Sequence, residues 1–353
     1  MPISAVDSLS PAFEHTKQQL FRPFNFGQWT RLALVGLFAG ELSSGGGCNF
    51  NIPTHGSTNH RDFLLATPHN WALLVPLVVI ALITLPLLWL LLIYVNSRMR
   101  FVLFDSVIAK RCDLGRMWRA RSQPALQYFL WQVVFFLATL AGTAVLLGVP
   151  AFIGFLLGWF TAPKAHLVPL ILTGILVFFV FIFWLLISIV VQVFTKDFVV
   201  PQMALENISA FEGWRRLWMM AGNEKGSYVG YGGMKLIMTI GAAFAVGIVA
   251  FIAILLLLIP FGGLGAITVI AGKAAGLTWN VFTITAAVVA GSIFLLIILY
   301  AVSLISVPVI IFFPAFSIYF FAARYPLLAR LMYPPPPPLP IAPPVPPTPE
   351  PIG

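Results

Sequence analysis

The side chains that could bind a metal or act in catalysis gather in one polar segment, residues 41–70. Glu41, Cys48, His55, His60 and His69 lie within it. Imidazole and thiolate groups are ligands of zinc and related metals. Their spacing here matches no compact metal site, and the glycine-rich stretch before Cys48 preorganises nothing. We expect no metal and no cofactor in this segment.

An enzyme that acts on a lipid headgroup needs acids or histidines that converge at one membrane interface. Glu41, Asp62 and the histidines of residues 41–70 are the main candidates on the external side. The chain contains neither a Gly-x-Ser-x-Gly nucleophile elbow nor a Walker loop. We therefore expect a protein that is not an enzyme.

The densest group of basic residues lies between residues 98 and 121, where two acids, Asp105 and Asp113, accompany the cations. Near an anionic leaflet each basic side chain contributes about 1 kcal/mol of attraction. We expect contact with anionic lipid headgroups; the alternative is that these residues only fix the orientation of the chain. The candidate contacts are Arg98, Arg100, Lys110, Arg111, Arg116, Arg119 and Arg121.

Composition places the chain among membrane proteins. Hydrophobic residues make up 60% and charged residues 9% of its 353 residues, against roughly 45–50% and about 25% in soluble proteins. The net charge of +9 could suggest nucleic acid, but that function needs a basic face on a folded polar domain. Here the charges flank long apolar runs, so we expect no nucleic-acid binding.

The apolar runs predict an all-α fold, a polytopic transmembrane bundle. A bilayer core of about 30 Å requires about 20 helical residues. The chain divides into a membrane domain, residues 1–333, and a proline-rich tail, residues 334–353. Six spans are predicted, at about 27–43, 71–95, 125–148, 167–194, 235–260 and 277–306.

The positions of lysine and arginine predict the topology. Seventeen of the 20 lie in alternate gaps between the apolar runs, and the other gaps hold only Arg61, Lys164 and Lys273. Cytoplasmic loops retain basic residues, so both termini should be cytoplasmic. The polar N-terminus does not resemble a secretory signal. Cys48 and Cys112 then lie on opposite sides and cannot form a disulfide.

The first span has the weakest signal, because only Leu32–Gly40 is continuously apolar. Taken alone, it could be a re-entrant segment. Parity favours a crossing: without one, the basic loop 96–125 would lie on the opposite side from the basic N-terminus. Glu41 then marks the external end of this span.

Charged and histidine side chains are absent from the cores of the other predicted spans, which contain only mildly polar groups. Ion-coupled transporters generally have acids or broken-helix carbonyls near the midplane, so this composition argues against ion coupling. The polar groups are Gln132, Gln192, Asn280 and Thr283.

Prolines are expected to break several helices. Pro150 and Pro260 precede short apolar pieces, which we interpret as interfacial or re-entrant segments. Pro308 and Pro314 are expected to divide the last apolar stretch into a span and a second helical piece.

Short similarities suggest three repeats of roughly 100 residues, each a cytoplasmic amphipathic helix followed by a transmembrane hairpin. Pro11-Ala-Phe-Glu resembles Ser209-Ala-Phe-Glu, and Phe198-Val-Val-Pro resembles Ile311-Phe-Phe-Pro. The alternative is chance, because apolar sequences match themselves easily.

The tail Pro334–Gly353 should be an extended polyproline II segment. It could bind an aromatic groove on a protein partner or be an unconstrained solubilising tail.

The N-terminal pattern Ser8-Leu-Ser-Pro-Ala-Phe-Glu, followed by Leu20-Phe-Arg-Pro-Phe-Asn-Phe and Trp29, resembles a family of uncharacterised prokaryotic six-span membrane proteins. Phe198-Val-Val-Pro and Phe211-Glu-Gly-Trp-Arg are distantly similar to the membrane domain of some glycerophosphodiester phosphodiesterases. The resemblance implies a helical membrane domain in a bacterial inner (plasma) membrane. It carries no catalytic residues, since no soluble phosphodiesterase domain is present.

Two functional hypotheses follow. The first is a non-enzymatic membrane component or interaction module. The second is a permease or lipid-handling protein for an apolar or amphipathic substrate, without ion coupling. A lipid-accessible cavity between spans would favour the second, and a tightly packed bundle would favour the first.

Overall fold

The computed structural model describes residues 4–41, 71–276 and 280–333. All regular secondary structure in these ranges is helical. The predicted tail, Pro334–Gly353, and Cys48, His55, His60, Asp62 and His69 of the polar segment lie outside the described residues.

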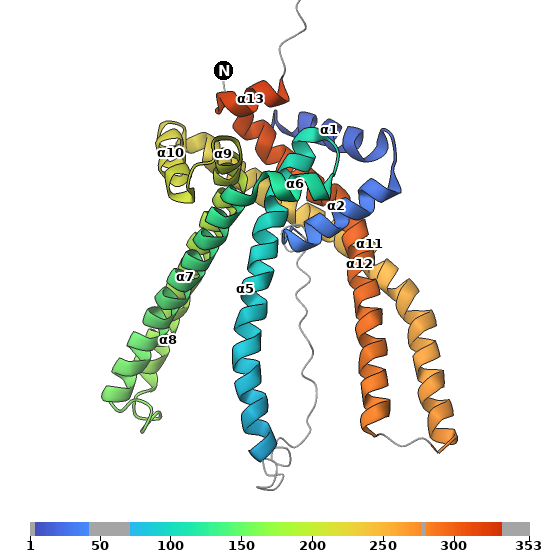
Figure 1. Cartoon of the computed structure of the whole chain (residues 1–353). Helices are drawn as coiled ribbons and strands as arrows, with labels where there is room; N and C mark the ends of the chain where they lie inside the picture. Colours follow the sequence, from blue (N-terminus) through green and yellow to red (C-terminus); the bar gives the residue numbers. More distant parts are fainter. Residues whose placement is uncertain (1–3, 42–70, 277–279, 334–353) are drawn as a thin grey trace, which may run out of the picture.

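The long helices form three arms that project from one packed end of the molecule (Figure 1). α5 forms one arm, α7 with α8 the second, and α11 with α12 the third. Their bounds are α5 Trp71–Ala109, α7 Ser122–Leu156, α8 Leu167–Phe194, α11 Lys225–Ala274 and α12 Val281–Ala322.

The packed end, which we call the head, contains the short helices together with the adjoining ends of the long ones (Figure 1). A π-helical turn, η2, joins α8 to α9. The elements are α1 Leu9–Phe21, α2 Phe26–Phe38, α6 Leu114–Ala120, η2 Thr195–Val199, α9 Val200–Glu206, α10 Ala210–Asn223 and α13 Pro326–Met332.

Five of the described helices are long and apolar enough to cross a membrane. The most apolar windows of α5, α7 and α8 bury none of their residues within the molecule. Such a continuous apolar surface is unfavourable in water, and α-helices satisfy their backbone hydrogen bonds internally in lipid. The chain is therefore a helical membrane protein whose arms present their side chains to the bilayer.

Aromatic side chains hold the head together. Tyr231 of α11 stacks on Phe316 and Phe320 of α12, with ring centroids 5.1 and 4.6 Å apart. Phe198 of η2 contacts Tyr231 and Phe321, with centroids 5.0 and 5.3 Å apart. All five rings are fully buried. Residues far apart in the sequence thus share one core, while the arms have none of comparable size.

The predicted breaks at the prolines are wrong. α7 continues through Pro150 to Leu156, and α11 continues through Pro260 to Ala274. α12 contains both Pro308 and Pro314 in one continuous helix. A proline in a membrane helix is tolerated where neighbouring groups satisfy the freed carbonyls. Pro308 leaves the Leu304 carbonyl without its helical donor, and the Trp29 indole N–H donates a hydrogen bond to that carbonyl at 2.9 Å.

The first predicted span, 27–43, is represented by α2, a helix of only 13 residues. At 1.5 Å per residue it is about 20 Å long, shorter than a bilayer core of about 30 Å. α2 packs in the head against α12 and α5. The count of six spans stays a prediction, and no helix of the described residues is assigned to the sixth crossing.

The short helices α1 and α10 form where amphipathic helices were predicted. Ser209 caps α10 by accepting a hydrogen bond from the Glu212 N–H at 3.3 Å. Leu217 is buried in the head, whereas Phe211 and Trp218 are exposed, so the apolar residues of α10 divide between two faces. A short helix precedes a helix pair three times, as α1 before α2 and α5, α6 before α7 and α8, and α10 before α11 and α12. The internal repeat itself stays a prediction.

Candidate functional site

The end of α2 brings the Glu41 carboxylate into the interior of the head. Gly40 adopts a left-handed conformation with φ of +71°, which suits glycine because it lacks a Cβ. The Glu41 N–H then donates to the Gly36 carbonyl at 3.0 Å, the long bond of a Schellman cap. This turn ends α2 and directs the Glu41 side chain toward Arg100 of α5.

Glu41 forms an ion pair with Arg100 of α5. The same guanidinium donates a hydrogen bond to the Ala39 carbonyl, so it binds both the side chain and the backbone at the end of α2. Glu41 and Arg100 are 7% and 5% exposed. Because a buried charge is costly unless it is paired, this contact fixes α2 against α5.

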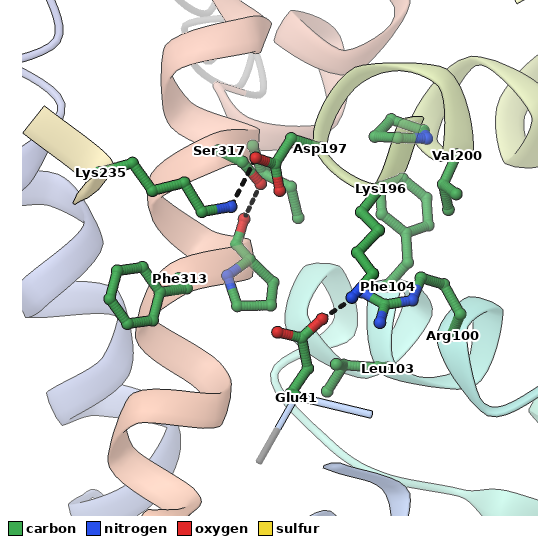
Figure 2. A pocket seen from close by; sticks show the side chains of 13 residues that line it. Glu41, Arg100, Leu103, Phe104, Lys196, Asp197, Val200, Lys235, Phe313 and Ser317 are labelled. Atoms are coloured by element: carbon green, nitrogen blue, oxygen red, sulfur yellow. Dashed lines mark hydrogen bonds and ion pairs between the residues drawn. The ribbon is translucent and has the colours of Figure 1, made fainter. Parts of the chain in front are cut away.

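A second ion pair lies on the other side of the same small cavity (Figure 2). Asp197 of η2 pairs with Lys235 of α11 and also accepts a hydrogen bond from the Tyr231 hydroxyl at 2.8 Å. The π-helical turn adds a residue to each hydrogen-bonded ring, and such turns are frequent at functional sites.

Lys196, the residue before Asp197, enters the cavity beside Arg100 and Glu41 (Figure 2). The cavity between the two ion pairs has a volume of about 30 Å³, enough for about one water molecule. Lys196 therefore adds a third cation to two carboxylates at the junction of the three arms.

A larger cavity, of about 210 Å³, lies between α5, α7 and α8. Its walls are mostly aromatic and aliphatic, and Lys196 lies in its lining as well. The lining residues are Trp89, Ile93, Tyr128, Trp131, Gln132, Phe135, Phe136, Val191, Gln192, Thr195 and Lys196. We call it the aromatic cavity; its one charged lining residue joins it to the smaller cavity.

The family comparison assigns no chemistry to this fold. The family model described as "Family of unknown function (DUF7544)" matches residues 3–331. The chain belongs to this family. No curated protein and no solved structure matches the chain. The match includes the head and all three arms and ends before the proline-rich tail, so the predicted resemblance to an uncharacterised family is confirmed.

The predicted lipid contacts Arg98, Arg100 and Arg121 make contacts inside the head. Arg98 donates to the Tyr94 hydroxyl and to the Trp118 carbonyl, at 2.8 and 3.2 Å. Arg100 lies in the buried pair described above. Arg121 pairs with Asp105 at 3.2 Å and donates to the Ala204 carbonyl. These three side chains bind helices to one another.

The other four predicted contacts lie on the surface: Lys110, Arg111, Arg116 and Arg119 are exposed. Lys110 donates to the Gln18 side chain at 2.8 Å. Headgroup contact by the full set of seven stays a prediction, and these four are the members whose charge is accessible for it.

The sequence reasoning missed the charged cluster. It placed Glu41 at the external end of the first span and Arg100 in a cytoplasmic loop, but the two residues are paired, so their predicted separation by the membrane is wrong. It also assigned Lys196 and Lys235 to loops. The available signal was position: each charge lies within a few residues of the end of an apolar run.

In the described parts of the chain, no group of three or more His, Cys, Asp or Glu residues could hold a metal ion.

Proposed function

We propose that this protein is a non-enzymatic lipid-handling component of the membrane, which binds an amphipathic molecule between its arms. The observation that carries the proposal is the aromatic cavity, which is about 210 Å³ in volume and lies between three membrane helices. Ligand sites of this kind are mostly apolar with a few polar groups that fix orientation. A cavity between apolar helices favours lipid handling over the interaction module, because a scaffold needs no internal space.

The polar end of the cavity is preorganised. Gln132 of α7 accepts a hydrogen bond from Ser97 of α5 at 2.6 Å and donates one to Asn96 at 3.2 Å. Asn96 in turn donates to the Phe38 carbonyl of α2 at 2.9 Å. This network connects the cavity to the head, so a ligand there can influence how α2, α5 and α7 pack.

The membrane and orientation are part of the same proposal. We place the protein in a bacterial inner membrane, with six spans and both termini cytoplasmic. The basic-residue pattern supports this orientation, as does the presence of both α1 and α13 in the head (Figure 1). The distant similarity to the membrane domain of glycerophosphodiester phosphodiesterases stays a prediction and carries no activity to this chain.

Lipid retention tests the proposal. The full chain is purified in mild detergent, washed extensively, and examined by native mass spectrometry for lipids that remain bound. Val191 lines the aromatic cavity, whereas its neighbour Val190 is 50% exposed on α8. We expect the wild type and Val190→Trp to retain lipid at a fixed stoichiometry, and Val191→Trp to lose it because its indole fills the cavity.

Equal retention by the two tryptophan variants would contradict binding in the cavity. A stoichiometric protein partner without retained lipid would favour the interaction module instead.

A further inference from the structure

The charges at the junction of the arms do not balance. Arg100 pairs with Glu41, and Lys235 pairs with Asp197. Lys196 has neither a hydrogen bond nor an ion pair with any residue that the structure describes. The Nε of the neighbouring Arg100 is buried without a hydrogen-bond partner. One positive charge and one buried donor are therefore left over in a region that excludes most water.

An unpaired charge in such surroundings is unfavourable. An anion that reaches Lys196 relieves this cost. Side-chain donors already bind both carboxylates: Arg100 binds Glu41, and Tyr231 and Lys235 bind Asp197. The two carboxylates therefore repel an anionic ligand less than unpaired carboxylates would. The groups left without a partner are the Lys196 ammonium and the Nε–H of Arg100. Both are hydrogen-bond donors on cations, so they favour an oxyanion such as a carboxylate or a phosphate.

The position of Lys196 indicates what carries that oxyanion. Lys196 lies at the boundary between the small polar cavity and the aromatic cavity. The latter's volume of about 210 Å³ is below the roughly 300–1,000 Å³ of sites that enclose a whole ligand. It therefore accommodates only part of a molecule, and the remainder has to continue along the apolar surfaces of the arms.

We propose that Lys196 binds the anionic group of an amphipathic lipid whose apolar chain enters the aromatic cavity between α5, α7 and α8. This inference rests on the proposed lipid-handling function and specifies its ligand class as an anionic amphipath. The oxyanion, a carboxylate or phosphate, lies at the Lys196 ammonium within reach of Arg100. The apolar chain of the lipid lies against Trp131 and Phe135 of α7 and Val191 of α8, which line the cavity.

Thermal stabilisation by defined lipids tests the assignment. The purified full chain is titrated in detergent with phosphatidylglycerol, with diacylglycerol of the same acyl chains, and with inorganic phosphate. We expect phosphatidylglycerol to stabilise the wild type most strongly, diacylglycerol weakly, and inorganic phosphate hardly at all. Lys196→Gln should weaken the affinity for phosphatidylglycerol by about tenfold or more and leave that for diacylglycerol unchanged.

Two variants act as matched controls. Lys225→Gln removes a positive charge from an exposed residue of the head and should retain wild-type affinity. Lys196→Arg keeps the charge and should retain most of the binding. Because Lys196 has no described partner, Lys196→Gln should unfold at the wild-type temperature or above without lipid, which separates loss of binding from loss of fold.

The outcomes distinguish this inference from the proposed function. If both lipids bind equally and Lys196→Gln changes neither affinity, the role of Lys196 is overturned while lipid binding stands. If Lys225→Gln weakens binding as much as Lys196→Gln, the effect is general surface attraction and the site is overturned. If inorganic phosphate stabilises as strongly as phosphatidylglycerol, the ligand is a free anion and not an amphipath. If no lipid stabilises the protein, the proposed function itself fails.

Discussion

Arg100 and Glu41 lie 59 residues apart in the sequence and form a buried ion pair that fixes the end of α2 against α5. Removing one partner leaves the other charge buried and unpaired, at a cost of about 3–5 kcal/mol. We therefore expect Glu41→Gln to lower the free energy of unfolding by this amount. Tryptophan fluorescence during thermal or denaturant unfolding in detergent measures it.

A double variant and an exposed pair provide the controls for this prediction. Replacing both partners, as in Glu41→Leu with Arg100→Met, removes the charges together and should be less destabilising than Glu41→Gln. Glu212 pairs with Arg215 and Arg216 near the surface of α10, so Glu212→Gln should unfold close to the wild type. A wild-type transition for Glu41→Gln would show that the ion pair does not stabilise the head.

Gly36 allows α2 and α12 to approach closely. A Cβ at this position would lie 2.5 Å from Cδ1 of Ile310, which is itself buried. Overpacking of this kind costs about 1–3 kcal/mol, so Gly36→Ala should reduce stability by that amount. Adding Ile310→Ala should remove the clash, so that Gly36→Ala costs less in that background.

Gly174 of α8 is the matched control, since nothing lies within 4 Å of a Cβ placed there. Gly174→Ala should be neutral or stabilising, because alanine favours helix over glycine by about 1 kcal/mol. Equal destabilisation at Gly36 and Gly174 would argue against close packing of α2 on α12.

The arms could be predicted from sequence, whereas the candidate site could not. A run such as Trp71–Tyr94 contains its own evidence, because length and uniform apolarity suffice to make a helix in a bilayer. The ion pairs involve residues separated by 59 and 38 positions, and no local pattern relates them. The rule that assigns charges beside an apolar run to loops also predicts a loop at Lys196 and Asp197. In the structure these two residues belong to η2, which continues α8.

The prolines were misinterpreted for a related reason. In an isolated helix, Pro260 or Pro308 removes a hydrogen bond and creates a clash. In the structure, the long helices α11 and α12 bend as they leave the head (Figure 1) without ending at a proline. Whether a proline ends a helix or bends it depends on the tertiary contacts around it, which sequence periodicity does not contain.

Cys112 should react slowly with thiol reagents while the protein is folded. Cys112 lies in the turn that joins α5 to α6, its side chain is buried, and this burial raises the pKa of the thiol. Because the thiolate is the reactive form, both access and ionisation are reduced. In a Cys48→Ser background, maleimide labelling at pH 7.5 should be much slower than after denaturation.

A control protein carries Cys48→Ser, Cys112→Ser and Gly115→Cys. Its one thiol lies at an exposed position of α6 and should label rapidly. Rapid labelling of folded Cys112 would contradict its burial.

His15 of α1 should make the stability of the head depend on pH. Its Nε2 donates to the Val107 carbonyl at 2.9 Å, so Nδ1 of the neutral ring accepts from the Tyr319 hydroxyl at 3.2 Å. Burial, and to a smaller extent the charge of Lys110, lowers the pKa of His15 below its ordinary value of 6.5.

As the pH falls below about 6.5, the unfolded chain therefore takes up a proton at this residue that the folded protein resists, and stability decreases. Unfolding measured from pH 7.5 to 5 should show the wild type losing stability relative to His15→Gln, in which the other histidines still titrate and cancel in the comparison. Parallel pH profiles for the two proteins would mean that His15 is protonated as readily in the folded head as in the unfolded chain, and that burial of the ring does not favour its neutral form.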